Sequence, residues 1–287
     1  MQTSRRGFVQ RLAAAAAGVS LGAPVMRAAA QARFLSAVTL GDFELYYEVH
    51  GEGSPVVFAH GAGGTHLSWW QQIPELSRHF QCVTFDHRGF GYSRDIDGGP
   101  GRAAFVQDLA GLLDHLGLDR VSLVGQSMGG WTTLGYASAH PERVHALVLC
   151  DTPGGYTDPE VAELMGRRSA EPGAFAPSFD AREPELAFLY REIQRSTLDR
   201  TAAGGPTAAA GLLQVPTDID PVVAHEIPTL FVVGAEDSIC PPPALEAMHR
   251  KMPASRFVEV PGAGHSVYFE KPDEFNRIVL EFLQHHA

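Results

Sequence analysis

The chain has 287 residues, of which 45% are hydrophobic and 19% charged, and its formal net charge at pH 7 is −11. This length and hydrophobic content suffice for one large domain with a full core. Because an acidic surface repels nucleic acid and anionic lipid, we expect neither as a partner.

The first 32 residues have the parts of a bacterial export signal. Arg5-Arg6 precedes the apolar, alanine-rich run from Leu12 to Val25, and Ala30-Gln31-Ala32 offers a cleavage site. Paired arginines are typical of twin-arginine signals, and the run is short for a membrane span. We therefore predict a cleaved signal over residues 1–32 and a periplasmic or secreted protein without stable membrane insertion. The alternatives are a disordered segment or an uncleaved anchoring helix.

Downstream, strand-like and helix-like segments alternate. Strands are predicted near 34–40, 43–49, 55–59, 81–85, 120–124, 144–149, 229–233 and 256–260. Helices are predicted near 67–78, 103–117, 128–140, 242–252 and 271–285. Such alternation is typical of right-handed βαβ crossovers and a parallel sheet. Gly41-Asp42 reads as a hairpin turn, so the first two strands should form an antiparallel edge.

The pentapeptide Gly125-Gln126-Ser127-Met128-Gly129 carries the strongest chemical signal. It follows an apolar strand and precedes a helix-like stretch, which is the context of the nucleophile elbow. The elbow holds a serine in a strained turn with its hydroxyl exposed, and its glycines let strand and helix approach closely. A serine hydroxyl is a weak nucleophile and needs a base, so Ser127 predicts a histidine partner.

Two later loops supply a base and an acid in the chain order that this elbow requires. Each loop follows a strand-like run, and we assign His265 as the base and Asp237 as the acid that orients it. Asp151, at the end of the preceding strand, is an alternative for the acid role. Glu236 is another, although strand-end geometry should point it elsewhere.

The reaction also needs donors for an oxyanion. The backbone N–H of Met128, directly after the nucleophile, should be one, and Ala62 in the glycine-rich loop after the third strand should be the other, with Gly63 as the alternative. Gly61-Ala62-Gly63 also resembles part of a dinucleotide fingerprint. The third glycine of that fingerprint would fall at His66, so we expect no nucleotide cofactor here.

Taken together, these motifs resemble the α/β-hydrolase family. The matching segments are His60-Gly61, Asp86 to Ser93, Gly125 to Gly130, Asp237 and Gly264-His265, in the family's order. The resemblance implies an α/β fold with an eight-stranded, mostly parallel sheet flanked by helices. It also implies a helical cap after strand 6 and cofactor-free hydrolysis of a small-molecule substrate through an acyl-serine.

The cap would occupy residues 154–224, where the strand and helix alternation breaks, and the core would comprise 33–153 and 225–287. Helical stretches are expected near 158–168 and 183–197. The segment holds six arginines, which could bind a substrate carboxylate or pair with acids on a solvated face. They are Arg167, Arg168, Arg182, Arg191, Arg195 and Arg200.

Within the family, Ser127-Met128-Gly129-Gly130 and the stretch from His140 to Thr152 are similar to 3-oxoadipate enol-lactonases, small carboxylesterases and cofactor-free haloperoxidases. We therefore predict cleavage of a carboxylic ester or lactone, with Gly61, Phe90 and Trp131 lining the substrate pocket. The alternatives are C–C hydrolysis of ring-cleavage products by the same residues, or perhydrolase activity. A non-catalytic ligand-binding protein on this scaffold is a further alternative.

Cys82, Cys150 and Cys240 lie far apart in the sequence and show no metal-ligand spacing, so no metal site is predicted. Cys150 and Cys240 follow strands that should be neighbours in this fold, which leaves a disulfide between them open. The sequence does not fix the oligomeric state.

Overall fold

The computed structural model describes residues 36–93, 95–96, 99–167, 173–198 and 216–287. The predicted export signal at 1–32 lies outside the described residues, as do Arg168 and Arg200. None of the helices in these ranges combines the length and apolar character needed to cross a membrane.

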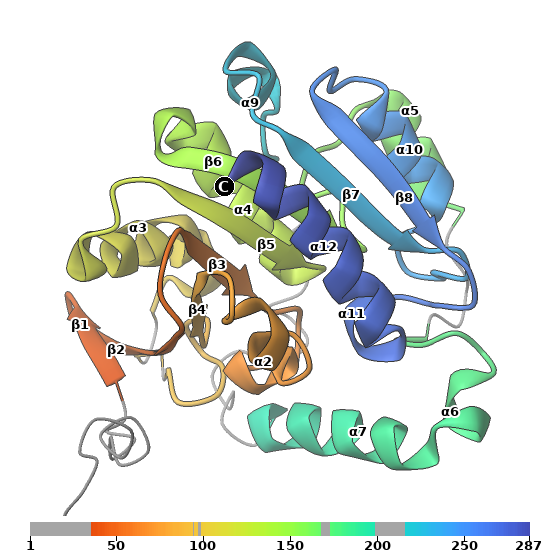
Figure 1. The fold of residues 1–287 in the computed structure, drawn as a ribbon, viewed down its shortest axis with the longest axis horizontal. Coiled ribbons are helices and arrows are strands. Elements are labelled where there is room, and N and C mark those ends of the chain that lie inside the picture. Colours follow the sequence, from red (N-terminus) through yellow and green to blue (C-terminus); the bar gives the residue numbers. More distant parts are fainter. Residues whose placement is uncertain (1–35, 94, 97–98, 168–172, 199–215) are drawn as a thin grey trace, which may run out of the picture. The chain divides into compact units, whose positions relative to one another are not determined.

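Within the described residues, eight strands form one sheet in the order β1-β2-β4-β3-β5-β6-β7-β8 (Figure 1). They are β1 (Ser36–Leu40), β2 (Phe43–His50), β3 (Pro55–Ala59), β4 (Gln81–Phe85), β5 (Val121–Gln126), β6 (Val144–Cys150), β7 (Thr229–Gly234) and β8 (Ser255–Val260). β1 pairs antiparallel with β2, β2 pairs antiparallel with β4, and every later pairing is parallel. The predicted fold class is confirmed, including the antiparallel edge.

Helices cover both faces of the sheet (Figure 1). The helical segments are η1 (His66–Trp69), α2 (Ile73–Leu76), η2 (Gly101–Ala104), α3 (Phe105–Leu116), α4 (Met128–Ala139), η3 (Pro141–Arg143), α5 (Pro159–Met165), α6 (Phe179–Arg182), α7 (Pro184–Leu198), α9 (Asp220–Ala224), α10 (Pro242–His249), α11 (Val267–Glu270) and α12 (Pro272–His286). One apolar cluster lies between one face of the sheet and the helices α3, α4 and α10. A second cluster lies between the other face and the helices α2, α11 and α12.

The central strands are buried on both faces. In β3, Val57 and Ala59 belong to the first cluster, whereas Val56 and Phe58 belong to the second. This alternation follows from the two-residue period of a strand. It explains why the parallel strands are short continuous apolar runs in the sequence, and why their positions could be predicted closely.

One predicted helix differs from the structure. The helix predicted at 67–78 is two short segments, η1 and α2. Pro74 lies in the first turn of α2; it has no N–H, and its ring would clash with the carbonyl of Trp70 in a continuous helix. The helix predicted at 271–285 is α12, and the separate turn α11 precedes it.

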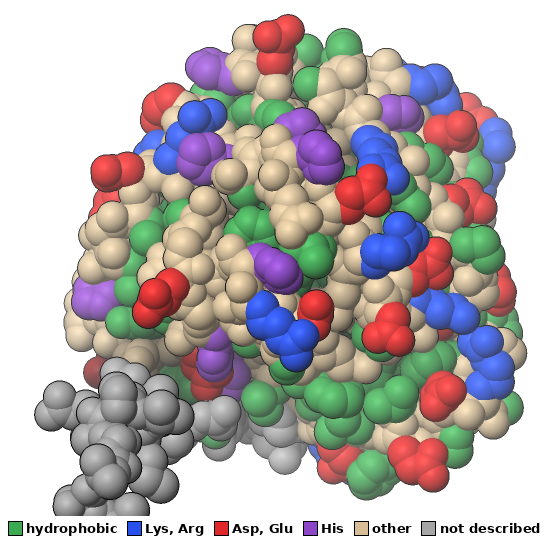
Figure 2. Space-filling model, in the orientation of Figure 1, with side chains coloured by type: hydrophobic (Ala, Val, Ile, Leu, Met, Phe, Trp, Pro, Cys, Tyr) green, Lys and Arg blue, Asp and Glu red, His purple; other side chains and the backbone are tan. Residues whose placement is uncertain are grey.

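The helices between β6 and β7 do not all pack together. α5 packs against α10 and α9 packs against α4, both on the helical layers of the core. α6 and α7 pack against each other, and α7 also contacts η1. Figure 2 shows hydrophobic side chains over the α7 region, where Phe188 and Leu189 are exposed. The division into core and cap at 154–224 stays a prediction, but α7 is the helix of this segment that lies beside the site below.

Candidate active site

Ser127 lies on the tight turn between β5 and α4, with φ 48° and ψ −115°. A non-glycine residue in such a conformation costs about 1–3 kcal/mol. The close packing of strand and helix imposes it, because a Cβ on Gly129 would lie 2.0 Å from the carbonyl oxygen of Ala59. A Cβ on Gly125 would lie 2.3 Å from Thr133 Oγ1. These contacts explain the two glycines of the elbow.

The structure brings Ser127, His265 and Asp237 together as predicted. His265 Nε2 lies 2.9 Å from Ser127 Oγ, and His265 Nδ1 lies 2.9 Å from Asp237 Oδ2. Because the carboxylate is an acceptor, Nδ1 carries the proton and Nε2 faces the serine with its lone pair. The three residues come from loops after β5, β7 and β8, at the carboxyl ends of parallel strands.

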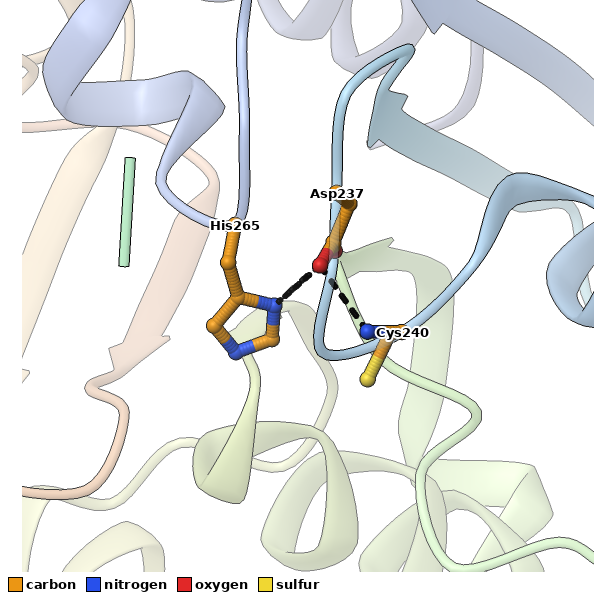
Figure 3. A group of neighbouring side chains, drawn as sticks. All are labelled: Asp237, Cys240 and His265. Atoms are coloured by element: carbon orange, nitrogen blue, oxygen red, sulfur yellow. Dashed lines mark hydrogen bonds and ion pairs between the residues drawn. The ribbon is translucent and has the colours of Figure 1, made fainter. Parts of the chain in front are cut away.

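Asp237 is held by backbone donors as well as by the imidazole. Its Oδ1 accepts from the N–H groups of Ile239 and Cys240, both at 2.8 Å. Figure 3 shows the carboxylate between the ring and the Cys240 backbone. This carboxylate is also part of a group that could hold a metal ion. The group consists of one ligand atom from each of Asp237, Cys240 and His265, and these three atoms lie within 4.8 Å of one another. A cation there would compete for the hydrogen bond that fixes the imidazole.

The two alternative acids are placed differently. Glu236 is exposed, so it does not face the imidazole. Asp151 is buried, with its Oδ1 accepting from Gly234 N–H at 3.0 Å and its Oδ2 from Val267 N–H at 3.1 Å. It therefore links the end of β7 to the start of α11, next to the loops that carry Asp237 and His265. Burial and the charge of Asp237 raise the pKa of its carboxyl.

The loop after β3 presents the predicted oxyanion donor. The Gly64 N–H bonds to the Gly61 carbonyl at 3.0 Å, and Gly63 has φ 78°, so residues 61–64 form a turn with Ala62 at its second position. The turn does not use the N–H of Ala62. The N–H of Met128 is similarly unused by α4, because it lies in the first turn of the helix. Neither N–H is thus used by the turn or the helix that holds it, and the role of the two groups as oxyanion donors stays a prediction.

His60 orders this loop. Its Nδ1 donates to the Gly61 carbonyl at 2.8 Å, and its Nε2 accepts from His87 N–H at 3.0 Å. Burial lowers the pKa of His60 to about 4, so the ring is neutral at working pH and both hydrogen bonds persist.

Two residues that the motifs did not identify also position the site. Gln126 Nε2 donates to the carbonyl of His265 at 2.8 Å and so links the elbow to the loop of the base. Glu270 Oε1 accepts from Gly264 N–H at 2.8 Å, and its Oε2 accepts from Ala176 N–H at 2.8 Å. The only sequence signals were a polar residue beside the nucleophile and an acid five residues after the base.

A small pocket, partly open to solvent, lies beside the loop after β3. Its lining residues come from that loop, η1, the elbow, α7 and α11. They are Gly61, Ala62, Gly64, Ser68, Gln126, Tyr190, Ile193, Gln194, Tyr268 and Phe269. Gly61 therefore lines the pocket as predicted.

Phe90 and Trp131, which were predicted to line the pocket, are not among its lining residues. The Phe90 ring packs instead near the rings of His60 and Phe105, with centroids 5.4 and 6.5 Å away. Trp131 packs against the loop after β6, where a Cβ on Gly155 would lie 2.6 Å from the indole. The position of a residue in the chain, whether in a motif as for Phe90 or in a helix as for Trp131, does not fix the direction of its side chain.

The described arginines between β6 and β7 take part in surface contacts. Arg191 pairs with Asp180, Arg195 with Glu192, and Arg167 with Glu163, in each case with exposed side chains. Arg182 contacts the carbonyl of Gly262 at an exposed position. These four arginines are therefore not placed to bind a carboxylate in the pocket.

All three cysteines are described and buried, and no disulfide joins them. Cys150 Sγ instead contacts Asp151 Oδ2 at 3.1 Å. The disulfide that the sequence left open between Cys150 and Cys240 is not formed.

The electrostatics of His265 predict how activity depends on pH. Burial alone would lower the pKa of the imidazole, but the carboxylates of Asp237, Asp151 and Glu270 more than offset this, so the pKa is raised. Only the neutral imidazole can accept the serine proton. We therefore expect kcat/KM to rise with pH through an apparent pKa above the ordinary histidine value of about 6.5. A pH–rate profile checks this, and a flat profile between about pH 5 and 9 would contradict the role of His265.

Comparison with known proteins shows the family of the chain. Residues 56–278 match the model of the alpha/beta hydrolase family. The chain is 31% identical to 2-hydroxy-6-oxo-2,4-heptadienoate hydrolase of Pseudomonas putida, over 86% of this chain and 95% of that one. It is 29% identical to the provisionally named non-heme bromoperoxidase BpoC of Mycobacterium tuberculosis, over 83% and 97%. Among solved structures, a thermophilic esterase from Thermogutta terrifontis is similar with a TM-score of 0.74 and 34% identity, covering 88% of this chain and all of that one.

Proposed function

The chain belongs to the alpha/beta hydrolase family, and from this premise we propose that it is a serine hydrolase that cleaves a small-molecule carboxylic ester or lactone. The observation that carries the proposal is the continuous relay from Ser127 Oγ through the His265 ring to Asp237, with both hydrogen bonds at 2.9 Å. A non-catalytic binding protein would have no need for a strained serine hydrogen-bonded to an oriented imidazole.

In the acylation step, His265 Nε2 takes the proton as Ser127 Oγ attacks the substrate carbonyl carbon. The carbonyl oxygen becomes an oxyanion, which the N–H groups of Met128 and Ala62 stabilise by hydrogen bonding. The imidazolium then gives its proton to the leaving oxygen as the tetrahedral intermediate collapses to an acyl-serine. Asp237 stabilises the imidazolium throughout and remains ionised.

Deacylation repeats these steps with water. His265 removes a proton from the water as its oxygen attacks the acyl carbon, and the returned proton restores the Ser127 hydroxyl. With peroxide in place of water, the same step would release a peracid, which is how a perhydrolase activity could arise as a side reaction.

C–C hydrolysis of ring-cleavage products is the second candidate, since the relative from Pseudomonas putida is named for such a substrate. That substrate carries a carboxylate. The described pocket-lining residues include no arginine or lysine, and the four described arginines nearby make surface contacts instead. This charge distribution favours a neutral ester or lactone over an anionic dienoate.

The proposal is tested with a fluorophosphonate probe and a substrate panel. We expect one covalent adduct, mapped to Ser127, on the folded protein and none after heat unfolding. The panel contains p-nitrophenyl esters, lactones and a ring-cleavage product, and we expect turnover of the first two classes. If the folded protein forms no adduct and cleaves no member of the panel, the hydrolase proposal fails.

A further inference from the structure

Helix α7 brings two polar side chains to the wall of the pocket. Tyr190 and Gln194 lie one helical turn apart, and both line the pocket together with residues of the loop after β3. A Cβ on Gly63 would lie 3.4 Å from Gln194 Cγ, so the Gln194 side chain lies directly against that loop. The Tyr190 ring is anchored between Phe175 and Phe269, with centroids 4.6 and 5.1 Å away.

The hydrogen bonds of Tyr190 leave its own proton available. The phenolic oxygen accepts from Ser266 Oγ at 3.4 Å, and the side chain of Gln194 interacts with the same hydroxyl. A phenol has a single O–H to donate, and the bond from Ser266 does not use it. Burial raises the pKa of Tyr190, so the hydroxyl keeps its proton across the working pH range. Tyr190 is thus a pre-oriented donor in the wall of the pocket.

The charges around the pocket select against an anion. Ser68, Gln126, Tyr190, Gln194 and Tyr268 are the polar members of its described lining, and none is a cation. Three acids, Asp237, Asp151 and Glu270, are buried close to His265 and act on its imidazole. A substrate carboxylate would therefore find no cationic partner among these described lining residues, whereas an uncharged oxygen needs only a hydrogen-bond donor.

The position of the base indicates which part of the substrate enters. His265 must reach the leaving oxygen to protonate it, so the leaving group extends past the imidazole. The pocket is lined by Ala62, whose N–H is the predicted oxyanion donor, and by Gln126 beside the nucleophile, whereas neither Ser127 nor His265 is among its lining residues. The group beside Tyr190 is therefore the acyl side of the ester.

We propose that Tyr190 donates a hydrogen bond to an uncharged oxygen on the acyl chain of the substrate, and that this residue determines acyl specificity. The preferred substrates are short acyl groups with an ether, ketone or hydroxyl oxygen near the scissile carbonyl. Plain alkyl chains and carboxylated chains are disfavoured. This inference rests on the proposed hydrolase function.

The test compares two p-nitrophenyl esters of nearly equal shape, methoxyacetate and butyrate, in which an ether oxygen replaces one methylene. Each kcat/KM is divided by the alkaline hydrolysis rate of that ester to remove intrinsic reactivity. Since one neutral hydrogen bond is involved, we expect a normalised preference for methoxyacetate of about fivefold in the wild-type protein. The p-nitrophenyl monoester of succinate should be a poorer substrate than either.

In Tyr190→Phe, which keeps the ring but removes the donor, the preference should fall to about 1. Gln194→Met should reduce it partially, because the polar side chain that interacts with the phenol is lost. Tyr47→Phe is the matched control, since Tyr47 lies on β2 and its hydroxyl contacts exposed His115; both esters should be cleaved as by the wild type.

A wild-type preference at or below 1 would overturn the inference without any variant, and so would a preference that persists in Tyr190→Phe. In either case, continued ester cleavage and Ser127 labelling would show that the hydrolase proposal stands. If the protein shows neither ester cleavage nor labelling of Ser127, the proposed hydrolase function itself is contradicted.

Discussion

Replacing Ser127 with alanine is expected to lower kcat/KM for ester substrates by about 10⁴- to 10⁶-fold, because no other group can form the acyl intermediate. Residual rate above water would come from the Met128 and Ala62 donors, which the substitution leaves in place. Within the part of the chain that the structure describes, the hydrogen bond of Ser127 Oγ is the one to His265 Nε2, so we expect little change in the melting temperature. Steady-state kinetics and thermal unfolding measure the two effects.

The same strand offers a matched control. Ser122 lies in β5, five residues before the nucleophile, and its buried Oγ has no hydrogen-bond partner among the described residues. Ser122→Ala should therefore retain wild-type turnover and lose no stability, since a buried unsatisfied hydroxyl is removed. If Ser127→Ala cleaves esters as well as Ser122→Ala does, the nucleophile has been assigned wrongly.

Much of the fold could be predicted because its signals are local. Parallel strands buried on both faces are short apolar runs, and the predicted ranges for β3 and β4 agree with the structure at both ends. The elbow could likewise be located, because close packing against Ala59 and Thr133 requires glycine at Gly129 and Gly125. In these cases the residue pattern that answers the constraint is contained in a few consecutive residues, even where the contact itself, as between Gly129 and Ala59, joins α4 to β3.

The rest depends on contacts between distant segments. Tyr190 reaches the pocket because α7 packs on Phe269, nearly 80 residues later in the chain, and no periodicity in α7 indicates this. Gln126 is recognisable as a positioning residue only once its bond to the His265 carbonyl is seen. Phe90 and Trp131 show the opposite case, since both were predicted to line the pocket and neither is among its lining residues.

The acid of the triad could not be settled from the sequence for a topological reason. β6 and β7 are neighbouring parallel strands, so Asp151 and Asp237 both follow strand ends at the same edge of the sheet. The structure separates them by what each carboxylate contacts. Asp237 accepts from the His265 ring, whereas Asp151 accepts from the backbones of Gly234 and Val267.

Asp237→Asn should therefore lower kcat by about 10⁴-fold at neutral pH while preserving the fold. An amide in this place can present its NH₂ to Nδ1, which favours the tautomer that carries its proton on Nε2 and so cannot accept from Ser127. The uncharged amide also fails to stabilise the imidazolium. Kinetics at neutral pH measure the loss, and circular dichroism checks that the fold is retained.

Asp151→Asn makes the same chemical change one strand away and separates catalysis from structure. Its NH₂ would face either the Gly234 or the Val267 N–H, donor against donor, at a cost of about 1–3 kcal/mol in the free energy of unfolding. The His265 ring keeps its partner, so turnover should fall far less than in Asp237→Asn. We therefore expect Asp151→Asn to be the less stable of the two variants and Asp237→Asn to be the slower enzyme. If Asp151→Asn instead loses more turnover than Asp237→Asn, then Asp151 orients the base and the hydrogen bond from His265 to Asp237 is not the one that catalysis uses.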